Sequence, residues 1–275
     1  TRIGELLPKE VVTGLLVIDG HDYGPEITVQ QLLQQVSGLP DYWASPDFFQ
    51  AFFADENRFW WPDELVEYAK DMKPIGLPGE TWHYADTNYV LLGIIIEAVT
   101  GRDLQDVFRR QIFRPLGMDV TYLSYREPPV SDLQESHRFE HTEDLYDKLR
   151  QSADWAGGGL VSNVEDLQTF MRALLRGELF AKPETLDLMM GWIPARRSEQ
   201  STRSIQYGMG LFRVDLAAER GELWGHDGWG NAFMYYWPEA DILFTGTLNQ
   251  AYNDWFPLVM HAVDQWIPSR GQHKD

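Results

Sequence analysis

The sequence predicts an α+β fold, with a mainly helical region followed by an antiparallel sheet and a covering helix. Three observations lead to this prediction. Helix-capping signals and helical apolar spacing recur through residues 1–200, four strand-like stretches follow in residues 201–275, and the chain closes with an amphipathic helical pattern. A chain of 275 residues suits one large domain. We therefore expect a single domain over residues 1–275.

The first helices are indicated by their start signals. Residues 28–31, Thr-Val-Gln-Gln, fit a capping box, in which a hydroxyl caps the helix and a Gln three residues later reaches back. This pattern predicts a helix that ends at Val36. Ser45-Pro46 predicts a second helix, with serine at the N-cap and proline in the first turn, and Pro62 begins a third.

Two longer helices follow. Asp86 is expected to cap a helix from Thr87 to about Val99, which is apolar on nearly all sides and should be buried. Thr100-Gly101 ends it, and another helix begins at Asp103. The pattern Ser-Asn-Val-Glu at residues 162–165 predicts a further helix, with Ser162 at the N-cap.

Residues 124–155 are polar and weakly periodic, and a long excursion of this kind is typical of a functional loop. His137 and His141 in this segment have the spacing of two metal ligands on a helix, but no third ligand is evident. A solvated loop is therefore the favoured interpretation. Arg196-Arg197 and Arg203 are expected to be exposed loop charges.

The last part of the chain favours strands joined by turns and then one helix. The closing segment carries large apolar residues at helical spacing from Trp255 to Trp266. The predicted strands are Tyr207 to Val214, Leu223 to His226, Ala232 to Trp237 and Ile242 to Leu248.

Composition limits the classes of function. A formal net charge of -19 argues against nucleic acid and anionic membrane surfaces as partners, because both require clustered Lys and Arg. The sequence contains no stretch of 18 uncharged apolar residues, so no membrane span is expected. The absence of cysteine excludes disulfides, thiolate metal sites and a cysteine nucleophile.

Two motifs carry most of the functional information. Residues 78–93 read PGETWHYADTNYVLLG, and residues 225–230 read GHDGWG at the expected end of a strand. Together they resemble the second and third signatures of the serine β-lactamase and penicillin-binding-protein superfamily. Residues 27–40, 113–118 and 156–167 resemble further landmarks of that family, in the same order. The resemblance extends from about residue 3 to 267.

This resemblance implies a β-lactamase/DD-peptidase-like fold and acyl transfer to water through a covalent acyl-serine. Neither a metal nor an organic cofactor is implied. The family favours a periplasmic or extracellular location, and a cytoplasmic one stays open.

The first family signature, Ser-x-x-Lys, is missing from this sequence. Each of the six lysines lacks a Ser or Thr three residues before it. We therefore expect the N-terminal strands and the nucleophile helix of the family to be absent from this chain. An upstream segment with Ser-x-x-Lys, from the same gene product or a separate chain, is the expected partner. Ser37 and Ser162 are rejected as substitutes, because a turn and a capping box explain them better.

Three residues of the two motifs fall on catalytic positions of the family. Tyr84 matches the tyrosine of its Tyr-x-Asn motif; a phenol titrates near pH 10, so base work near neutrality needs cationic neighbours. Asp86 stands where the family usually has Asn, and a carboxylate accepts hydrogen bonds but cannot donate. Asp86 would instead pair with an ammonium group. His226 occupies the first place of the third motif and would face the site.

The last two positions belong to substrate binding. Gly228 would permit close approach of the backbone, and the Trp229 N–H is the implied second donor of an oxyanion hole. The indole of Trp229 is predicted either to line the pocket mouth or to be buried in the core.

The sequence is thus interpreted as a serine hydrolase of the penicillin-binding-protein type, with its nucleophile segment missing from this chain. Its substrates would be small esters, D-amino-acid amides or peptides, or β-lactams. Asp86 and His226 favour small esters or peptides over efficient β-lactam hydrolysis. The alternative is a non-catalytic binding or scaffold module that has lost Ser-x-x-Lys; the retained Tyr84 and His226 argue against it.

Overall fold

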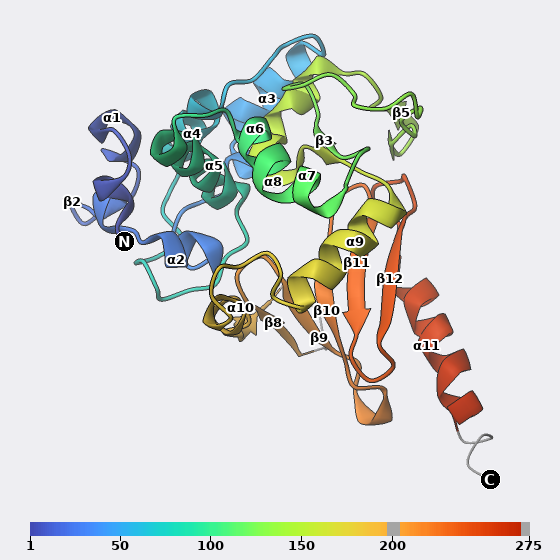
Figure 1. The fold of residues 1–275 in the computed structure, drawn as a ribbon. Helices are drawn as coiled ribbons and strands as arrows, with labels where there is room; N and C mark the ends of the chain where they lie inside the picture. Colours follow the sequence, from blue (N-terminus) through green and yellow to red (C-terminus); the bar gives the residue numbers. More distant parts are fainter. Residues whose placement is uncertain (197–203, 271–275) are drawn as a thin grey trace.

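The computed structural model describes residues 1–196 and 204–270, and Figure 1 shows a helical part followed by a sheet with covering helices. The α+β fold class predicted from the sequence is thereby confirmed. Arg197 and Arg203, expected to be exposed loop charges, lie outside the described residues. The helices are α1 (Lys9–Val12), α2 (Val29–Leu33), α3 (Pro46–Ala54), α4 (Pro62–Lys70), α5 (Asp86–Thr100), α6 (Leu104–Phe108), α7 (Arg114–Leu116), α8 (Trp155–Gly158), α9 (Val164–Leu175), α10 (Glu184–Met189) and α11 (Phe256–Arg270).

The main sheet is a six-stranded antiparallel meander in the order β12-β11-β10-β9-β8-β7. Each strand pairs with its sequence neighbour, so the order in space follows the order along the chain. Among the described residues, β12 forms one edge and pairs with β11 alone. The strands are β7 (Ile193–Ala195), β8 (Ile205–Tyr207), β9 (Phe212–Asp215), β10 (Glu222–Asp227), β11 (Ala232–Trp237) and β12 (Ile242–Thr247).

Helices cover both faces of this sheet. Along β11, Tyr235 and Trp237 pack with the apolar residues of α11, whereas Met234 and Tyr236 pack with those of α9. This alternation is expected, because successive side chains of a strand point to opposite faces. The closing helix predicted from the apolar spacing is thereby confirmed as α11, and Figure 1 shows α9 lying along β11 and β12.

The predicted strand from Tyr207 to Val214 is wrong in one respect, because two strands occupy this stretch. β8 ends at Tyr207 and β9 begins at Phe212, and the two pair with each other. Gly210 has φ +88°, a left-handed conformation that lets the chain reverse between them. The apolar Met209 and Leu211 continue the strand-like pattern through this turn, although the glycines beside them are turn signals.

The observed N-termini of the helices can be compared with the caps predicted from the sequence. The capping box of Thr28 and Gln31 and the Ser45 cap are both confirmed. The helix after Thr28 ends at Leu33 rather than Val36, because Gln35 adopts a left-handed conformation with φ 60°. The predicted cap at Ser162 is wrong: Asn163 accepts from the Asp166 N–H, while the Ser162 hydroxyl lies 2.8 Å from that of Thr121.

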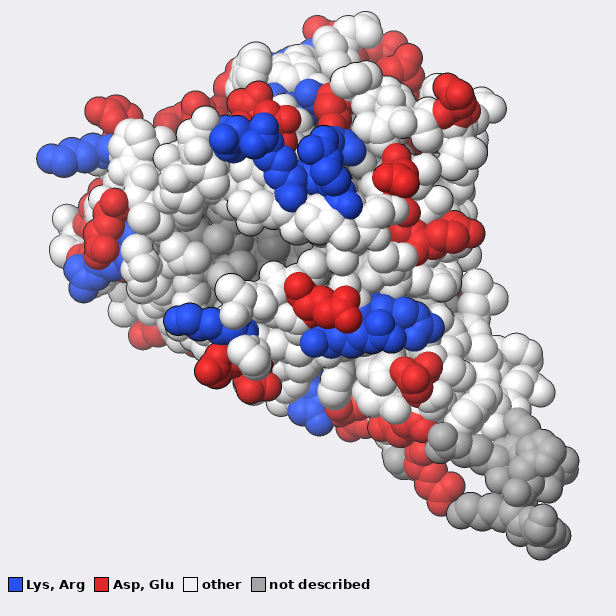
Figure 2. Space-filling model, viewed as in Figure 1, with Lys and Arg blue, Asp and Glu red and all other residues white. Residues whose placement is uncertain are grey.

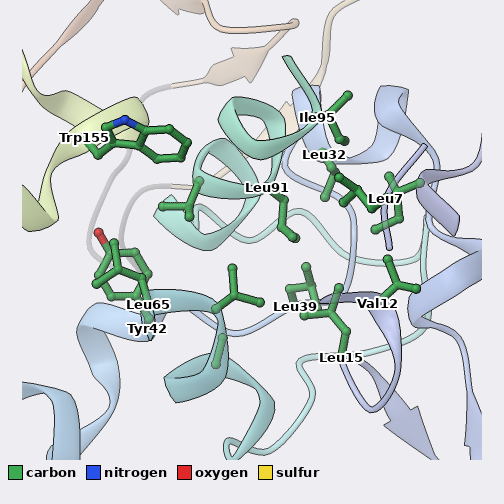
Figure 3. Packing of buried hydrophobic residues seen from close by; sticks show 14 of the residues in the cluster. Leu7, Val12, Leu15, Leu32, Leu39, Tyr42, Leu65, Leu91, Ile95 and Trp155 are labelled. Atoms are coloured by element: carbon green, nitrogen blue, oxygen red, sulfur yellow. The ribbon is translucent and has the colours of Figure 1, made fainter. Parts of the chain in front are cut away.

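The core of the helical part gathers around α5. Figure 3 shows Leu91 of α5 among Leu32, Leu65 and Trp155, which come from α2, α4 and α8. An added Cβ at Gly93 would lie 2.7 Å from Ala156, so glycine allows α8 to approach α5 closely. This close approach brings residues 156–158 to the N-terminal end of α5.

The excursion over residues 124–154 is an ordered loop that carries one small hairpin. The smaller strands in the described part of the chain form three two-stranded sheets: β1 (Val17–Ile18) with β2 (His21–Asp22), β3 (Tyr122–Leu123) with β6 (Leu160–Val161), and β4 (Phe139–Glu140) with β5 (Glu143–Asp144). The β4 strand lies against the segment after β12, where the Phe139 N–H donates to Asn249 O at 2.9 Å and the Ala251 N–H donates to Phe139 O at 2.8 Å. The excursion therefore reaches the end of the main sheet. In the part of the chain that the structure describes, no helix combines the length and apolarity needed to span a membrane.

Gly225 on β10 leaves no space for a side chain. An added Cβ would lie 2.0 Å from the backbone oxygen of Met234 and 2.7 Å from the Cα of Tyr235 on the neighbouring strand. We predict that Gly225→Ala lowers the free energy of unfolding by about 3 kcal/mol or more, because the clash is with backbone of a central strand. Urea unfolding checks this. Gly228→Ala is the matched control, since the nearest atom to its added Cβ lies 3.9 Å away. Equal stability of the two variants would contradict the prediction.

Candidate active site

Tyr84 and His226 lie side by side where the helical part meets the sheet. Tyr84 lies two residues before the start of α5, and His226 lies on β10. Their ring centroids are 6.0 Å apart and the ring planes are tilted by 41°. The structure therefore brings together the two catalytic candidates that are farthest apart in the sequence.

Aromatic side chains of the sheet hold both rings. The Phe212 ring stacks on Tyr84 with centroids 6.3 Å apart and lies 4.9 Å from the His226 ring. The Tyr207 ring meets both of them edge-on, at 6.4 and 6.2 Å. Such packing restricts the rotamers of the two candidate residues, because the surrounding rings are themselves buried.

The tautomer of neutral His226 follows from its backbone contact. Its Nδ1 lies 2.9 Å from the backbone oxygen of Asp227. A carbonyl oxygen only accepts, so Nδ1 carries the hydrogen and donates. In the neutral imidazole, Nε2 is then the nitrogen with the lone pair, which can take a proton.

Asp86 does not have the capping role predicted for it. The helix α5 begins at Asp86 itself, and Ala85 is its N-cap, without a side-chain hydrogen bond. The carboxyl of Asp86 instead lies against Gly157, where an added Cβ would be 3.3 Å from Cγ of Asp86. It also receives a hydrogen bond from the Trp43 side chain. Gly157 of α8 and the side chain of Trp43, rather than the first turn of α5, therefore contact this carboxyl.

Two further aspartates, Asp41 and Asp154, form an acid cluster with Asp86. Asp41 accepts from the backbone N–H groups of Trp43, at 3.2 Å, and of Asp86, so it is Asp41 that serves the start of α5. Burial raises the pKa of Asp86 well above its usual value, and the charges of Asp41 and Asp154 raise it further. Burial also raises the pKa of Asp41 to about 6.

Asp154 links this acid cluster to the excursion. Burial raises the pKa of Asp154, and the nearby Arg138 guanidinium lowers it; Nη2 of Arg138 is 3.5 Å from the carboxylate. Sequence reasoning missed Asp41, Asp154 and Arg138. The polar character of the excursion is the one local signal for Asp154 and Arg138, and Asp41, which lies outside the excursion, has none. Only the folded chain brings these residues together.

Gly228 and Trp229 lie in the turn between β10 and β11. The Gly228 N–H donates to Ala232 O at 2.7 Å, which closes the turn. The Trp229 side chain is 49 % exposed, so its indole lies at the surface rather than in the core. Figure 2 shows that the molecule is hollowed where the helical part meets the sheet, and that uncharged residues form most of the wall.

The rejected nucleophiles have structural hydrogen bonds. Ser37 is buried, donates to Asn88 Oδ1 at 2.6 Å and accepts from the Leu39 N–H. The Ser162 hydroxyl pairs with Thr121, as described above. His137 bonds Asp144 at 2.6 Å, and the described residues contain no group of three or more His, Cys, Asp or Glu that would hold a metal.

Comparisons with known proteins identify the family of the chain. The family described as Beta-lactamase matches residues 2–264. Among curated proteins, an unguisins hydrolase of Aspergillus campestris is 28% identical over 64% of this chain and 32% of its own length. A penicillin-binding protein of Bacillus subtilis is 27% identical over 74% of this chain and 46% of its own length. The chain thus spans about a third to a half of the length of these curated relatives.

Solved structures give the same result at the level of the fold. A D-stereospecific amidohydrolase from a Streptomyces species has a TM-score of 0.78 at 28% identity, and the match covers 92% of this chain and 76% of that one. The D-amino acid amidase of Ochrobactrum anthropi SV3, complexed with D-phenylalanine, has a TM-score of 0.73 at 25% identity, over 94% of this chain and 88% of that one. With a family match over nearly its whole length, the chain belongs to the Beta-lactamase family.

Proposed function

We propose that residues 1–275 form the greater part of a serine-hydrolase site that cleaves small amides or esters through an acyl-enzyme. The observation that carries this proposal is the contact between the rings of Tyr84 and His226, at 6.0 Å, in a chain of the Beta-lactamase family. A tyrosine and a histidine in contact can pass a proton between them, so together they can take the proton of a nucleophile and return it to the leaving group.

The roles follow from the geometry. Tyr84 takes the proton of the attacking serine while its own phenol proton passes to Nε2 of His226, and both transfers reverse when the leaving group is protonated. The Trp229 N–H, in the turn after β10, stabilises the oxyanion. The serine and its lysine come from a Ser-x-x-Lys segment that residues 1–275 do not contain.

The acid cluster gives this missing lysine a function. The charges of Asp41 and Asp154 raise the pKa of Asp86 beyond the effect of burial, and an ammonium group beside Asp86 would offset that repulsion. Asp86 is therefore proposed to hold the lysine of Ser-x-x-Lys. Because Asp86 has no amide N–H to offer an acylamino group, simple amides and esters, including those of D-amino acids, are the proposed substrates rather than penicillins.

Labelling with a fluorophosphonate tests the proposal. Residues 1–275 alone and the whole gene product that contains them are each treated with the probe and examined by mass spectrometry. We expect no labelled serine within residues 1–275, and stoichiometric labelling of the serine of a Ser-x-x-Lys sequence in the active material. Labelling of Ser37, Ser162 or another serine of this chain would mean that the nucleophile is misplaced. No labelling in either sample would favour the non-catalytic binding module.

A further inference from the structure

Two exposed aromatic side chains, Trp229 and Tyr252, stand next to the candidate active site. Trp229 is 49 % and Tyr252 65 % exposed, and their rings meet edge-to-face with centroids 6.2 Å apart. Trp229 follows His226 by three residues, which span at most about 10 Å of chain. The pair, called here the aromatic rim, therefore lies within reach of a molecule bound at Tyr84 and His226.

The neighbours of the aromatic rim hold Trp229 in place. The Arg138 guanidinium lies 5.7 Å from the centre of the Trp229 ring, and its Nη2 donates to Gln151 Oε1 at 2.8 Å. The stem of Arg138 packs on the backbone beside the indole, because an added Cβ at Gly230 would lie 2.5 Å from its Cδ. The position of Trp229 is thus fixed by contacts that leave about half of its surface exposed.

Tyr252 is held in a similar way. The His141 ring stacks on its ring with centroids 4.7 Å apart, and the Tyr252 hydroxyl donates to Glu140 Oε1 at 2.7 Å. An exposed aromatic ring without contacts can change rotamer freely. The Tyr252 ring has both a stacking partner and a hydrogen bond, which restrict its rotamer. Aromatic side chains held in this manner contribute contact area at a low cost in conformational entropy.

The backbone under the aromatic rim is strained. Four residues other than glycine adopt left-handed conformations there: His141 with φ 53°, Asn231 with φ 59°, Asn249 with φ 52° and Tyr252 with φ 65°. Such conformations cost about 1–3 kcal/mol each and gather at ligand-binding sites. Hydrogen bonds tie the strained segments together; Nδ2 of Asn231, for example, donates to the backbone oxygen of Gln250. The backbone that carries these two rings is therefore held in conformations that cost free energy.

We infer that the aromatic rim is a subsite for an uncharged aromatic group of the substrate, next to the scissile bond. An aromatic group packs on two rings in an edge-to-face pair better than an aliphatic group of the same size. A cationic group is disfavoured, because the Arg138 guanidinium already lies over Trp229. This inference rests on the proposed function, since it names the substrate class of that site.

Equilibrium binding tests the aromatic rim separately from catalysis. Dissociation constants are measured by NMR titration for D-phenylalaninamide, D-cyclohexylalaninamide and D-alaninamide. We expect the phenyl compound to bind about threefold to tenfold more tightly than the cyclohexyl compound. Tyr252→Leu and Trp229→Leu should each bring this ratio to near one, and Trp229→Leu keeps the backbone N–H of the proposed oxyanion donor. Phe49→Leu is the control, because Phe49 of α3 is 54 % exposed but lies outside the aromatic rim.

The outcomes separate the two proposals. No preference for the phenyl compound in the unaltered protein, or a preference that survives both rim substitutions, would overturn the subsite. Loss of the preference in Phe49→Leu would also count against it. A phenyl preference that depends on the aromatic rim, without hydrolysis of any of the three amides by the whole gene product, would support the subsite and contradict the proposed function. Hydrolysis of the amides without a phenyl preference would support the proposed function and contradict the subsite.

Discussion

Replacing Tyr84 with Phe is expected to lower kcat/KM for ester hydrolysis by about 10²- to 10⁴-fold, the usual contribution of a positioned general base. The substitution removes one oxygen and leaves the ring, which Phe212 and Tyr207 hold in place. Binding of the substrate should change little, so the loss should appear in kcat. Steady-state kinetics with p-nitrophenyl acetate, on material that a fluorophosphonate labels, measures both constants.

Tyr207→Phe is the control for this experiment. The hydroxyl of Tyr207 lies 3.0 Å from that of Tyr89, and burial raises the pKa of Tyr207 well above its usual value, so this phenol stays protonated. We expect its removal to cost about 1 kcal/mol of stability and to leave kcat nearly unchanged. Similar losses of kcat in the two variants would show that the aromatic packing, and not the Tyr84 oxygen, supports the reaction.

Replacing aspartates of the acid cluster with Asn is expected to stabilise residues 1–275 above pH 6. The pKa of Asp41 rises to about 6 on folding, mainly through burial, and that of Asp86 rises in the same direction. The folded state therefore favours the protonated carboxyl. Its contribution to stability is complete below about pH 4 and is lost as the pH rises through about 6. An amide keeps the shape of the protonated acid and carries no charge at any pH.

Urea unfolding at pH 4 and pH 8 measures this effect. Asp41→Asn should gain about 1–3 kcal/mol at pH 8 relative to pH 4, from 1.36 kcal/mol per pH unit. Asp86→Asn should change in the same direction. Asp132→Asn, an exposed residue of the excursion, serves as the control and should show no such difference. A loss of stability in Asp41→Asn at pH 8 would mean that a cation already neutralises the cluster in this chain.

Local signals in the sequence were reliable where the physics is local. The caps at Thr28 and Ser45 depend on contacts within three or four residues, so the side chains themselves specify them. Asn163 caps α9 in place of Ser162. Either side chain can cap a helix, but the Ser162 hydroxyl is bonded to Thr121, which is distant in the sequence. The break between β8 and β9 was missed because the apolar Met209 and Leu211 continue the strand-like pattern, although Gly208 and Gly210 are turn signals.

The candidate site was predictable only in part, because some of its residues are brought together by contacts between distant parts of the chain. Its motif residues stand in two recognisable stretches, and the fold brings Tyr84 and His226 together. Asp41, Asp154 and Arg138 carry no motif of their own, and they matter because the chain folds them against Asp86 and Trp229. Long-range placement of this kind leaves no period or spacing in a single sequence. The charge balance of the site thus became visible only in three dimensions.

The meander order of the main sheet has a consequence for how the site comes into being. Since every strand of β7–β12 pairs with its neighbour along the chain, the sheet can grow by successive hairpins with short loop closures. Tyr84, by contrast, must find His226 across more than half of the sequence, and that encounter carries a larger loop-closure entropy. We therefore expect the sheet to acquire its pairing early in folding, and the contact that defines the site to form among the last.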